Sequence, residues 1–208
     1  HQGKGIFKKL TLQQAEACKQ EGVQFVFNTP NTQSKPGYLK MGWVEQGKMP
    51  LKFKIVQPLA LGYSMMFNKK KVSSYKDDPT PHMQWSELLF QKVDQAVAVD
   101  DQLSTAVSGA YVKWRYAENP LANYNYVTDN ENFLVILRMK EHFFGKELRI
   151  SDFILLNKEV SSKKVSSLIR KAILQYSRKN NARFISLSGQ QYQQYKTYFS
   201  WMGIVPVR

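Results

Sequence analysis

Apolar residues recur at helical spacing in the first part of the chain. Within residues 5–21 they fall near one face of a helix, and Gly22 follows as a natural helix end. The residues of this apolar face are Ile6, Leu10, Leu12, Ala15, Ala17 and Cys18. The pattern therefore predicts an amphipathic helix at the start of the chain.

A short apolar run follows this helix. Residues 23–27 read Val-Gln-Phe-Val-Phe and predict a buried strand, which Pro30 ends because proline cannot donate to a strand ladder. A second, short helix is predicted from about residue 34 or 37 to residue 41, where Gly42 ends it. Helix, strand and helix joined by short links are typical of an α/β protein.

Residues 43–68 carry a different pattern. Apolar and polar residues alternate, most clearly at 52–56, which predicts strands in this region. Residues 59–67 are more apolar but include Gly62, and their spacing fits a strand or a helix equally. Lysines and prolines then punctuate residues 69–84, which we interpret as a linker.

The second half of the chain alternates strands and helices. Two turn sequences, at 129–132 and 144–146, fall between apolar runs and predict hairpins. The predicted elements are a helix over 84–100, strands over 124–128, 133–140 and 148–156, a helix over 161–180, a strand over 183–187, a helix over 190–202 and a strand over 204–207.

Helix, strand, helix, glycine and strand thus occur in the same order twice, at 6–44 and at 161–207. We interpret the chain as an α/β protein with two related units, each a mixed sheet with flanking helices. The first unit is predicted over residues 1–68, residues 69–84 link the two, and the second unit is predicted over 85–208.

Composition supports a folded chain. Hydrophobic residues make up 43% of the 208 residues, which is enough for a core. Cys18 is the single cysteine, so the sequence offers no internal disulfide, and we expect this thiol to be buried rather than reactive. The sequence has no signal peptide and no run of about 20 apolar residues, which predicts a cytoplasmic protein without a membrane span.

Charge points towards anionic ligands. The formal net charge is +14, and the excess is spread over both halves of the chain. Such a balance suits the phosphates of coenzyme A, nucleotide-sugars or RNA, and it is equally typical of a basic solvated surface. His1, His82 and His142 are far apart in the sequence, so no metal site is predicted.

A glycine-rich turn opens the chain directly before the first helix. Its residues are Gln2, Gly3, Lys4, Gly5, Ile6 and Phe7. Glycine lets the backbone approach an anion closely, and the free N–H groups and dipole of a helix start attract phosphate. Further along, Asn31, Ser34, Tyr38, Gly42 and Trp43 stand at positions one, four, eight, twelve and thirteen of a second pattern.

Together the two patterns resemble the GNAT superfamily of acyl-CoA N-acyltransferases. In that family a Gln/Arg-x-x-Gly-x-Gly/Ala turn holds the pyrophosphate of coenzyme A, and Gln2-Gly3-Lys4-Gly5 fits its first four positions. Phe7 departs from the small residue of the sixth position. A second family pattern is matched by Asn31, Ser34, Tyr38, Gly42 and Trp43. The two patterns follow one another in the same order as in the family.

The resemblance implies a cofactor and a reaction. It implies that an acetyl or other acyl group passes from acyl-CoA to a primary amine, without a metal. Tyr38 is the candidate acid that protonates the leaving thiolate, because a phenol has a pKa near 10; its ring packing on the cofactor is the alternative. The resemblance places the cofactor on Gln2, Gly3, Lys4, Gly5, Ile6, Asn31 and Ser34.

Several roles stay open. Asn31 either binds the pantetheine arm or caps the following helix, and Lys4 either neutralises a phosphate or points to water. The family's general base commonly lies on strands before the glycine turn, so we expect the first unit to be incomplete in this chain. Glu45 and Glu118 are interpreted as surface acids. Trp114 and Arg115 are candidates to line an acceptor pocket, and the alternative for Trp114 is packing in a core.

The second predicted unit resembles a degenerate GNAT-like unit. Residues 114–124 resemble the Trp-Arg-Tyr, Asn-Pro and Tyr stretch of some bacterial tandem members, but no glycine turn precedes the helix at Ser161. That helix is rich in Lys and Arg and has no acid, so its face suits an RNA backbone as well as water. The alternatives to an acyl-CoA transferase are therefore a catalytically silent scaffold and a tRNA-dependent aminoacyl transferase.

Overall fold

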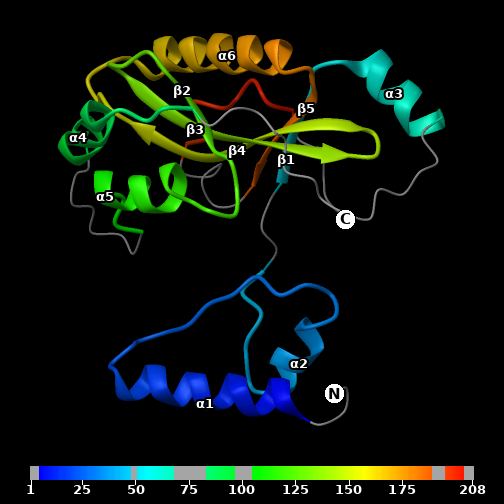
Figure 1. Ribbon diagram of the computed structural model, residues 1–208, viewed down its shortest axis with the longest axis vertical. Coiled ribbons are helices and arrows are strands. Elements are labelled where there is room, and N and C mark those ends of the chain that lie inside the picture. The colour runs from blue at the N-terminus through cyan, green and yellow to red at the C-terminus, as the bar shows by residue number, and fades with distance from the viewer. Residues whose placement is uncertain (1–4, 48–50, 68–82, 97–104, 189–194, 204–208) are drawn as a thin grey trace. The chain divides into compact units, whose positions relative to one another are not determined.

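The computed structural model describes residues 5–47, 51–67, 83–96, 105–188 and 195–203. The chain divides into two compact units, His1–Lys48 and Met49–Arg208, here called unit 1 and unit 2. Figure 1 shows the helices and strands of both units. Unit 1 holds two helices, and unit 2 holds a sheet with helices on both faces.

Unit 1 consists of α1 (Ile6–Gln20) and α2 (Lys35–Lys40). Both helices agree with the sequence prediction, and Gly22 and Gly42 follow them with φ angles of 80° and 87°. These left-handed conformations suit glycine because it has no Cβ atom. Among residues 5–47, no side chain is buried.

The strand expected over residues 23–27 does not form. Those residues have an irregular backbone and no ladder partner, and all of them are exposed. A strand requires hydrogen bonds from a neighbouring strand, and the described part of unit 1 contains none. The prediction was wrong because apolar alternation alone supplies no partner.

Unit 2 is built on a five-stranded mixed sheet. Its strands lie in the order β1-β5-β4-β3-β2, and every neighbouring pair is antiparallel except β4 and β5. The strands are β1 (Leu51–Ile55), β2 (Asn125–Thr128), β3 (Phe133–His142), β4 (Gly145–Leu155) and β5 (Ala182–Ser188). The α/β class and the mixed sheet with flanking helices are thereby confirmed.

Helices cover both faces of this sheet (Figure 1). The long helix α6 (Ser162–Lys179) connects β4 to the parallel strand β5 and packs on one face, where Val165, Ile169 and Ile173 are buried. On the other face lie α4 (Glu87–Ala96), α5 (Gly109–Val112) and the π-helix η1 (Lys113–Ala117). Unit 2 thus has two apolar layers, one on each side of the sheet.

A β-bulge lies in β4. Ile136 pairs with Asp152 while Leu137 pairs with Ile150, so Ser151 is the extra residue. Because side chains alternate along a strand, one extra residue exchanges the faces of those that follow it. The bulge thereby puts Phe153 in the core under α6 and leaves Asp152 on the opposite face.

Several sequence predictions of unit 2 are confirmed. The three strands with their two hairpin turns, the helix α6 and the strand β5 all lie within two or three residues of the expected bounds. The region that fitted strand or helix equally forms α3 (Pro58–Phe67), a helix. Residues 195–203 form successive turns rather than the expected helix, while 189–194 and 204–208 lie outside the described residues.

The boundary between the units differs from the expected one. The first unit was predicted to reach residue 68, but β1 pairs with β5 and its backbone hydrogen bonds therefore belong to the sheet of unit 2. The helix α3 is also held there, because the guanidinium of Arg183 donates to the Ala60 carbonyl and, at 2.7 Å, to Ser64 Oγ. Residues 51–67 therefore extend the second unit.

Candidate functional site

The predicted cofactor turn ends at the start of α1. Gly5 is its N-cap and has a φ of 65°, a left-handed conformation that other residues rarely adopt. No side chain caps this helix start, and the Gly5 carbonyl accepts the Lys9 amide at 3.0 Å. The first N–H groups of α1 are therefore directed at the turn. Gln2, Gly3 and Lys4 lie outside the described residues.

The start of α1 lies against α2. The ring of Phe7 is 5.1 Å from the ring of Tyr38 in an edge-to-face contact, and Tyr38 is 5.0 Å from Trp43 on its other side. A Cβ atom on Gly37 would lie 2.8 Å from the Phe7 ring. Glycine at position 37 is thus needed for the close approach, and Phe7 has the structural task of joining the two helices.

The Tyr38 side chain is half-buried, and its hydroxyl makes no hydrogen bond within the described part of the chain. Tyr38 meets the start of α1 through the ring of Phe7, which follows Gly5 and Ile6 in the sequence. Phe7, which departs from the first pattern, is thus the residue whose ring meets Tyr38 of the second pattern.

Asn31 and Ser34 form the turn that begins α2. The Asn31 Oδ1 atom accepts the amides of Gln33 and Ser34, at 3.1 and 2.8 Å, and the Ser34 hydroxyl at 2.9 Å. These hydrogen bonds hold the turn before α2, whose N-cap residue is Ser34 and which has no side-chain cap of its own. The Asn31 Nδ2 group makes no hydrogen bond among the described residues, so both of its N–H donors are free for a ligand.

The other candidate residues have surroundings of their own. Glu45 forms an ion pair with Lys35 at 2.7 Å. Trp114 and Arg115 lie in η1 of unit 2, where both are exposed, so Trp114 is not a core residue. Cys18 is half-buried rather than enclosed in a core.

A buried carboxylate of unit 2 forms a cluster that the sequence did not reveal. Glu147 on β4 is 2% exposed, and its Oε2 atom lies 2.5 Å from His142 Nε2. Its Oε1 atom accepts from Arg149 Nε at 3.0 Å and from the Ser186 hydroxyl. Burial alone would raise the pKa of Glu147, but these donors and the Arg149 charge together lower it below its usual value.

This arrangement is not a nucleophilic triad. In a serine triad the imidazole lies between the hydroxyl and the carboxylate, so that it accepts the serine proton. Here the carboxylate lies between Ser186 and His142, and the serine proton points to Glu147. We interpret the cluster as a structural one that fixes the β3–β4 hairpin against β5.

A second buried carboxylate lies on the same face of the sheet. The Tyr116 hydroxyl donates to Asp152 Oδ2 at 2.7 Å, and the Phe153 amide donates to Oδ1 at 2.8 Å. Burial raises the pKa of Asp152, against the lowering effect of these hydrogen bonds. Burial also raises the pKa of Tyr116. The pair joins η1 to the bulge of β4.

Hairpin register was the signal that could have revealed the Glu147 cluster. The turn predicted at 144–146 pairs Lys140 with Glu147 and so places His142 diagonally opposite that carboxylate. The bulge that exposes Asp152 to Tyr116 had no signal in the sequence. The pairing of the two hairpin strands was therefore predictable from the sequence, whereas the bulge in β4 was not.

Comparison of the chain with protein-family models, curated proteins and solved structures gave no match. Among the described residues no group of His, Cys, Asp or Glu is arranged to hold a metal ion. None of the helices in the described ranges is long and apolar enough to cross a bilayer. The functional assignment therefore rests on the α1–α2 cluster and its family resemblance.

Proposed function

We propose that this protein is an acyl-CoA-dependent N-acyltransferase of the GNAT type. In the proposal, the turn before α1 holds the diphosphate of coenzyme A, and Tyr38 lies beside the thioester. The two units are related GNAT-like units, of which only the first binds the cofactor. The supporting observation is the edge-to-face contact between the ring of Phe7, at the start of α1, and the ring of Tyr38 in α2.

The chemistry assigned to Tyr38 is proton donation. The acceptor amine attacks the thioester carbonyl, the carbon–sulfur bond breaks, and the thiolate of coenzyme A leaves. The Tyr38 hydroxyl gives its proton to that thiolate, whose basicity is comparable with that of a phenol. The amine loses its proton to a base, which the family resemblance places on strands before the turn and which we leave unassigned.

Electrostatics around the turn supports an anionic ligand. Lys8 and Lys9 are exposed in the first turn of α1, and that turn contains no acid. Two ammonium groups next to an uncapped helix start favour a diphosphate, because the helix dipole and the charges act in the same sense. Gly5 has no Cβ atom, so an anion can approach this part of the backbone closely.

Calorimetric titration with acetyl-CoA tests the proposal, since binding does not require the unassigned base. We expect acetyl-CoA to bind at least 10-fold more tightly than S-acetylpantetheine, which lacks the nucleotide and its phosphates. Equal affinity would contradict a phosphate cradle. No binding of either compound would favour the silent scaffold or the tRNA-dependent transferase.

Substitution of Tyr38 separates its two roles. In Tyr38→Phe the ring still packs between Phe7 and Trp43, but the hydroxyl is lost. We expect acetyl-CoA affinity to stay within about 3-fold, while acetyl transfer to a panel of amino-sugars, small amines and peptide amino termini falls about 100-fold. The control is Tyr63→Phe in α3, an exposed tyrosine of unit 2. An unchanged rate in Tyr38→Phe would remove the acid role.

A further inference from the structure

The outer surface of α6 carries a shallow furrow that the proposed transferase does not use. Two adjoining cavities, of about 550 and 450 Å³, lie along this helix and share Ser167 and Arg170. We call them together the α6 furrow. Its side chains come from α6 and from the turns at 195–203: Lys163, Ser166, Ser167, Arg170, Lys171, Leu174, Gln175, Arg178, Thr197, Ser200 and Trp201.

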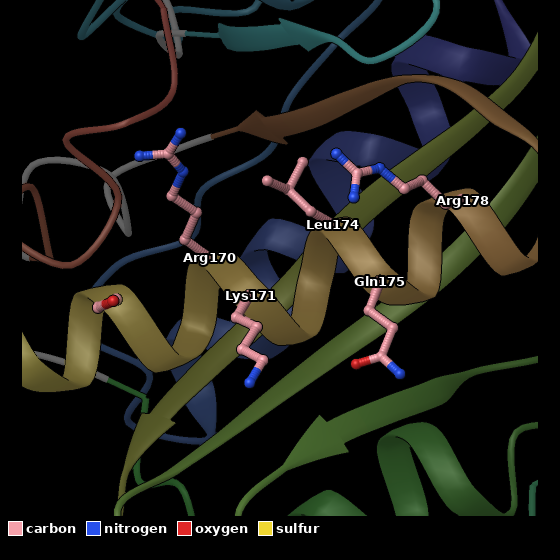
Figure 2. Close-up of a pocket in the computed structure, with 6 residues that line it drawn as sticks. Arg170, Lys171, Leu174, Gln175 and Arg178 are labelled. Carbon is pink, nitrogen blue, oxygen red and sulfur yellow. The ribbon is translucent and has the colours of Figure 1, made fainter.

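Figure 2 shows how the side chains of α6 frame the first cavity. Arg170, Leu174 and Arg178 form one row at intervals of four residues, and Lys171 and Gln175 form a second row beside it. Residues four apart lie on the same helix face. The two rows therefore give the furrow charged and polar walls along the helix axis.

The furrow is strongly basic. Four of its residues are cations with exposed side chains: Lys163, Arg170, Lys171 and Arg178. From Ser161 to the end of the chain the sequence contains no Asp or Glu. None of the four cations forms an ion pair within the described ranges, so their charge is available to an external anion.

The length of the furrow indicates a polymer. Lys163 and Arg178 are fifteen residues apart on one helix, which corresponds to about 22 Å along its axis. A single nucleotide or phosphate would meet only one or two of these cations. A nucleic-acid strand places successive phosphates along such a distance and would neutralise all four.

An aromatic side chain lies at one end of the furrow. Trp201 is half-buried, and its indole N–H donates to the Tyr198 carbonyl at 3.1 Å. The Ser166 hydroxyl on α6 donates to the same carbonyl at 3.1 Å, which ties the turns at 195–203 to the helix. An indole fixed beside a basic groove provides a surface on which a base can stack.

We propose that the α6 furrow binds a single-stranded nucleic acid, for which an RNA strand is the probe below. The phosphates lie along Lys163, Arg170, Lys171 and Arg178, and one base stacks on Trp201. A basic concave groove with a stacking indole favours a single strand over an anionic membrane, because the furrow presents no large exposed apolar side chain for insertion. The inference does not depend on the acyltransferase proposal.

Fluorescence anisotropy with a labelled twelve-nucleotide oligouridylate tests this inference on the full chain. We expect a dissociation constant on the order of 10 µM at 0.1 M salt, and a slope of about −3 in log K against log salt for four phosphate contacts. The slope follows from about 0.7 per phosphate for single strands. Absence of binding at 100 µM protein would overturn the proposal.

A matched pair of double variants makes the test specific. Arg170→Glu with Arg178→Glu reverses two cations of the furrow, whereas Lys164→Glu with Lys179→Glu makes the same charge change at exposed α6 positions outside it. We expect at least a 30-fold loss of RNA affinity in the first variant and less than 5-fold in the second. Equal losses would show diffuse attraction and overturn a defined site.

Two further measurements exclude other anionic partners and folding defects. Vesicles of phosphatidylcholine with 25% phosphatidylserine should not compete with the oligonucleotide; displacement of the RNA by vesicles would contradict the proposal. Trp201→Phe keeps an aromatic ring and should weaken RNA binding 2- to 5-fold, while its thermal midpoint confirms that unit 2 is folded. An unchanged affinity would remove the stacking contact from the account.

Discussion

The helices α1 and α6 have similar apolar stripes but different surroundings. In unit 2, α6 packs on a sheet and buries Val165, Ile169 and Ile173 completely. In unit 1, α1 has an apolar face of comparable length, and none of its residues is buried within the unit. An amphipathic sequence therefore produces a helix in both units, but it produces a core only where a paired sheet offers a face.

This difference has consequences for stability. Most helical stability in proteins comes from burial of one face rather than from propensity. Unit 1 has the aromatic contacts of Phe7, Tyr38 and Trp43 and the Asn31 turn, but residues 5–47 enclose no core. We therefore expect the cooperative unfolding transition of the chain to report unit 2.

The largest contrast is expected from core substitutions. Ile169→Ala removes a fully buried side chain from the layer between α6 and the sheet and should lower the free energy of unfolding by about 2–5 kcal/mol. Leu10→Ala, at a position of α1 that is 59% exposed, should change it by less than about 0.5 kcal/mol. Urea unfolding followed by circular dichroism measures both. Equal losses would mean that Leu10 is buried against another surface.

A smaller effect is expected at the buried carboxylate of unit 2. Glu147→Gln removes the charge that holds Arg149 and His142. It should lower the free energy of unfolding by about 1–3 kcal/mol at pH 7. The pKa of Glu147 is lowered in the folded state, so its contribution is complete above the unfolded value of about 4.3 and is lost as the pH falls through the folded pKa.

The pH dependence distinguishes this cluster from general acid unfolding. The difference in the free energy of unfolding between wild type and Glu147→Gln should become smaller as the pH falls below about 4. Glu159→Gln, an exposed acid in the loop before α6, is the control and should have little effect at any pH. A Glu147→Gln difference that stays constant from pH 7 to pH 3 would contradict the role given to the charge.

The smallest effects are expected at the helix caps. Ser161 Oγ accepts the Lys164 amide at the start of α6, and Ser161→Ala should lower the free energy of unfolding by about 1 kcal/mol. Asn31→Ala removes the corresponding contacts before α2 and should leave the main transition unchanged, because α2 belongs to unit 1. Scanning calorimetry compares the two. A lower main midpoint in Asn31→Ala would show that the units unfold together.

The parts of the fold that the sequence predicted are those with long, regular patterns. The strands β2, β3 and β4 alternate strongly and are separated by recognisable turns, and α6 has a complete apolar stripe between Ser161 and Asn180. The run at 23–27 has equally apolar residues but no partner in the described part of its unit. A strand depends on its neighbours, and a single segment does not contain that information.

The candidate sites were predictable to a different extent. The resemblance singled out Gly5 and Tyr38, but the packing of the Phe7 ring on Tyr38 and Gly37 could not be predicted from it. The Glu147 cluster joins residues of two hairpin strands with Ser186 of β5, which follows in sequence only after α6. The hairpin register connects His142 with Glu147, but the contact with Ser186 depends on the order of the whole sheet and could not be predicted from the sequence.

Hydrogen exchange of the full chain, with and without acetyl-CoA, tests the central proposal most directly. If the turn and Tyr38 form the cofactor site, saturating acetyl-CoA should slow amide exchange in peptides covering residues 5–10 and 34–43. Peptides of β3, β4 and α6 should exchange as before. Unchanged exchange throughout, or protection confined to unit 2, would contradict the assignment of the acyl-CoA site to unit 1.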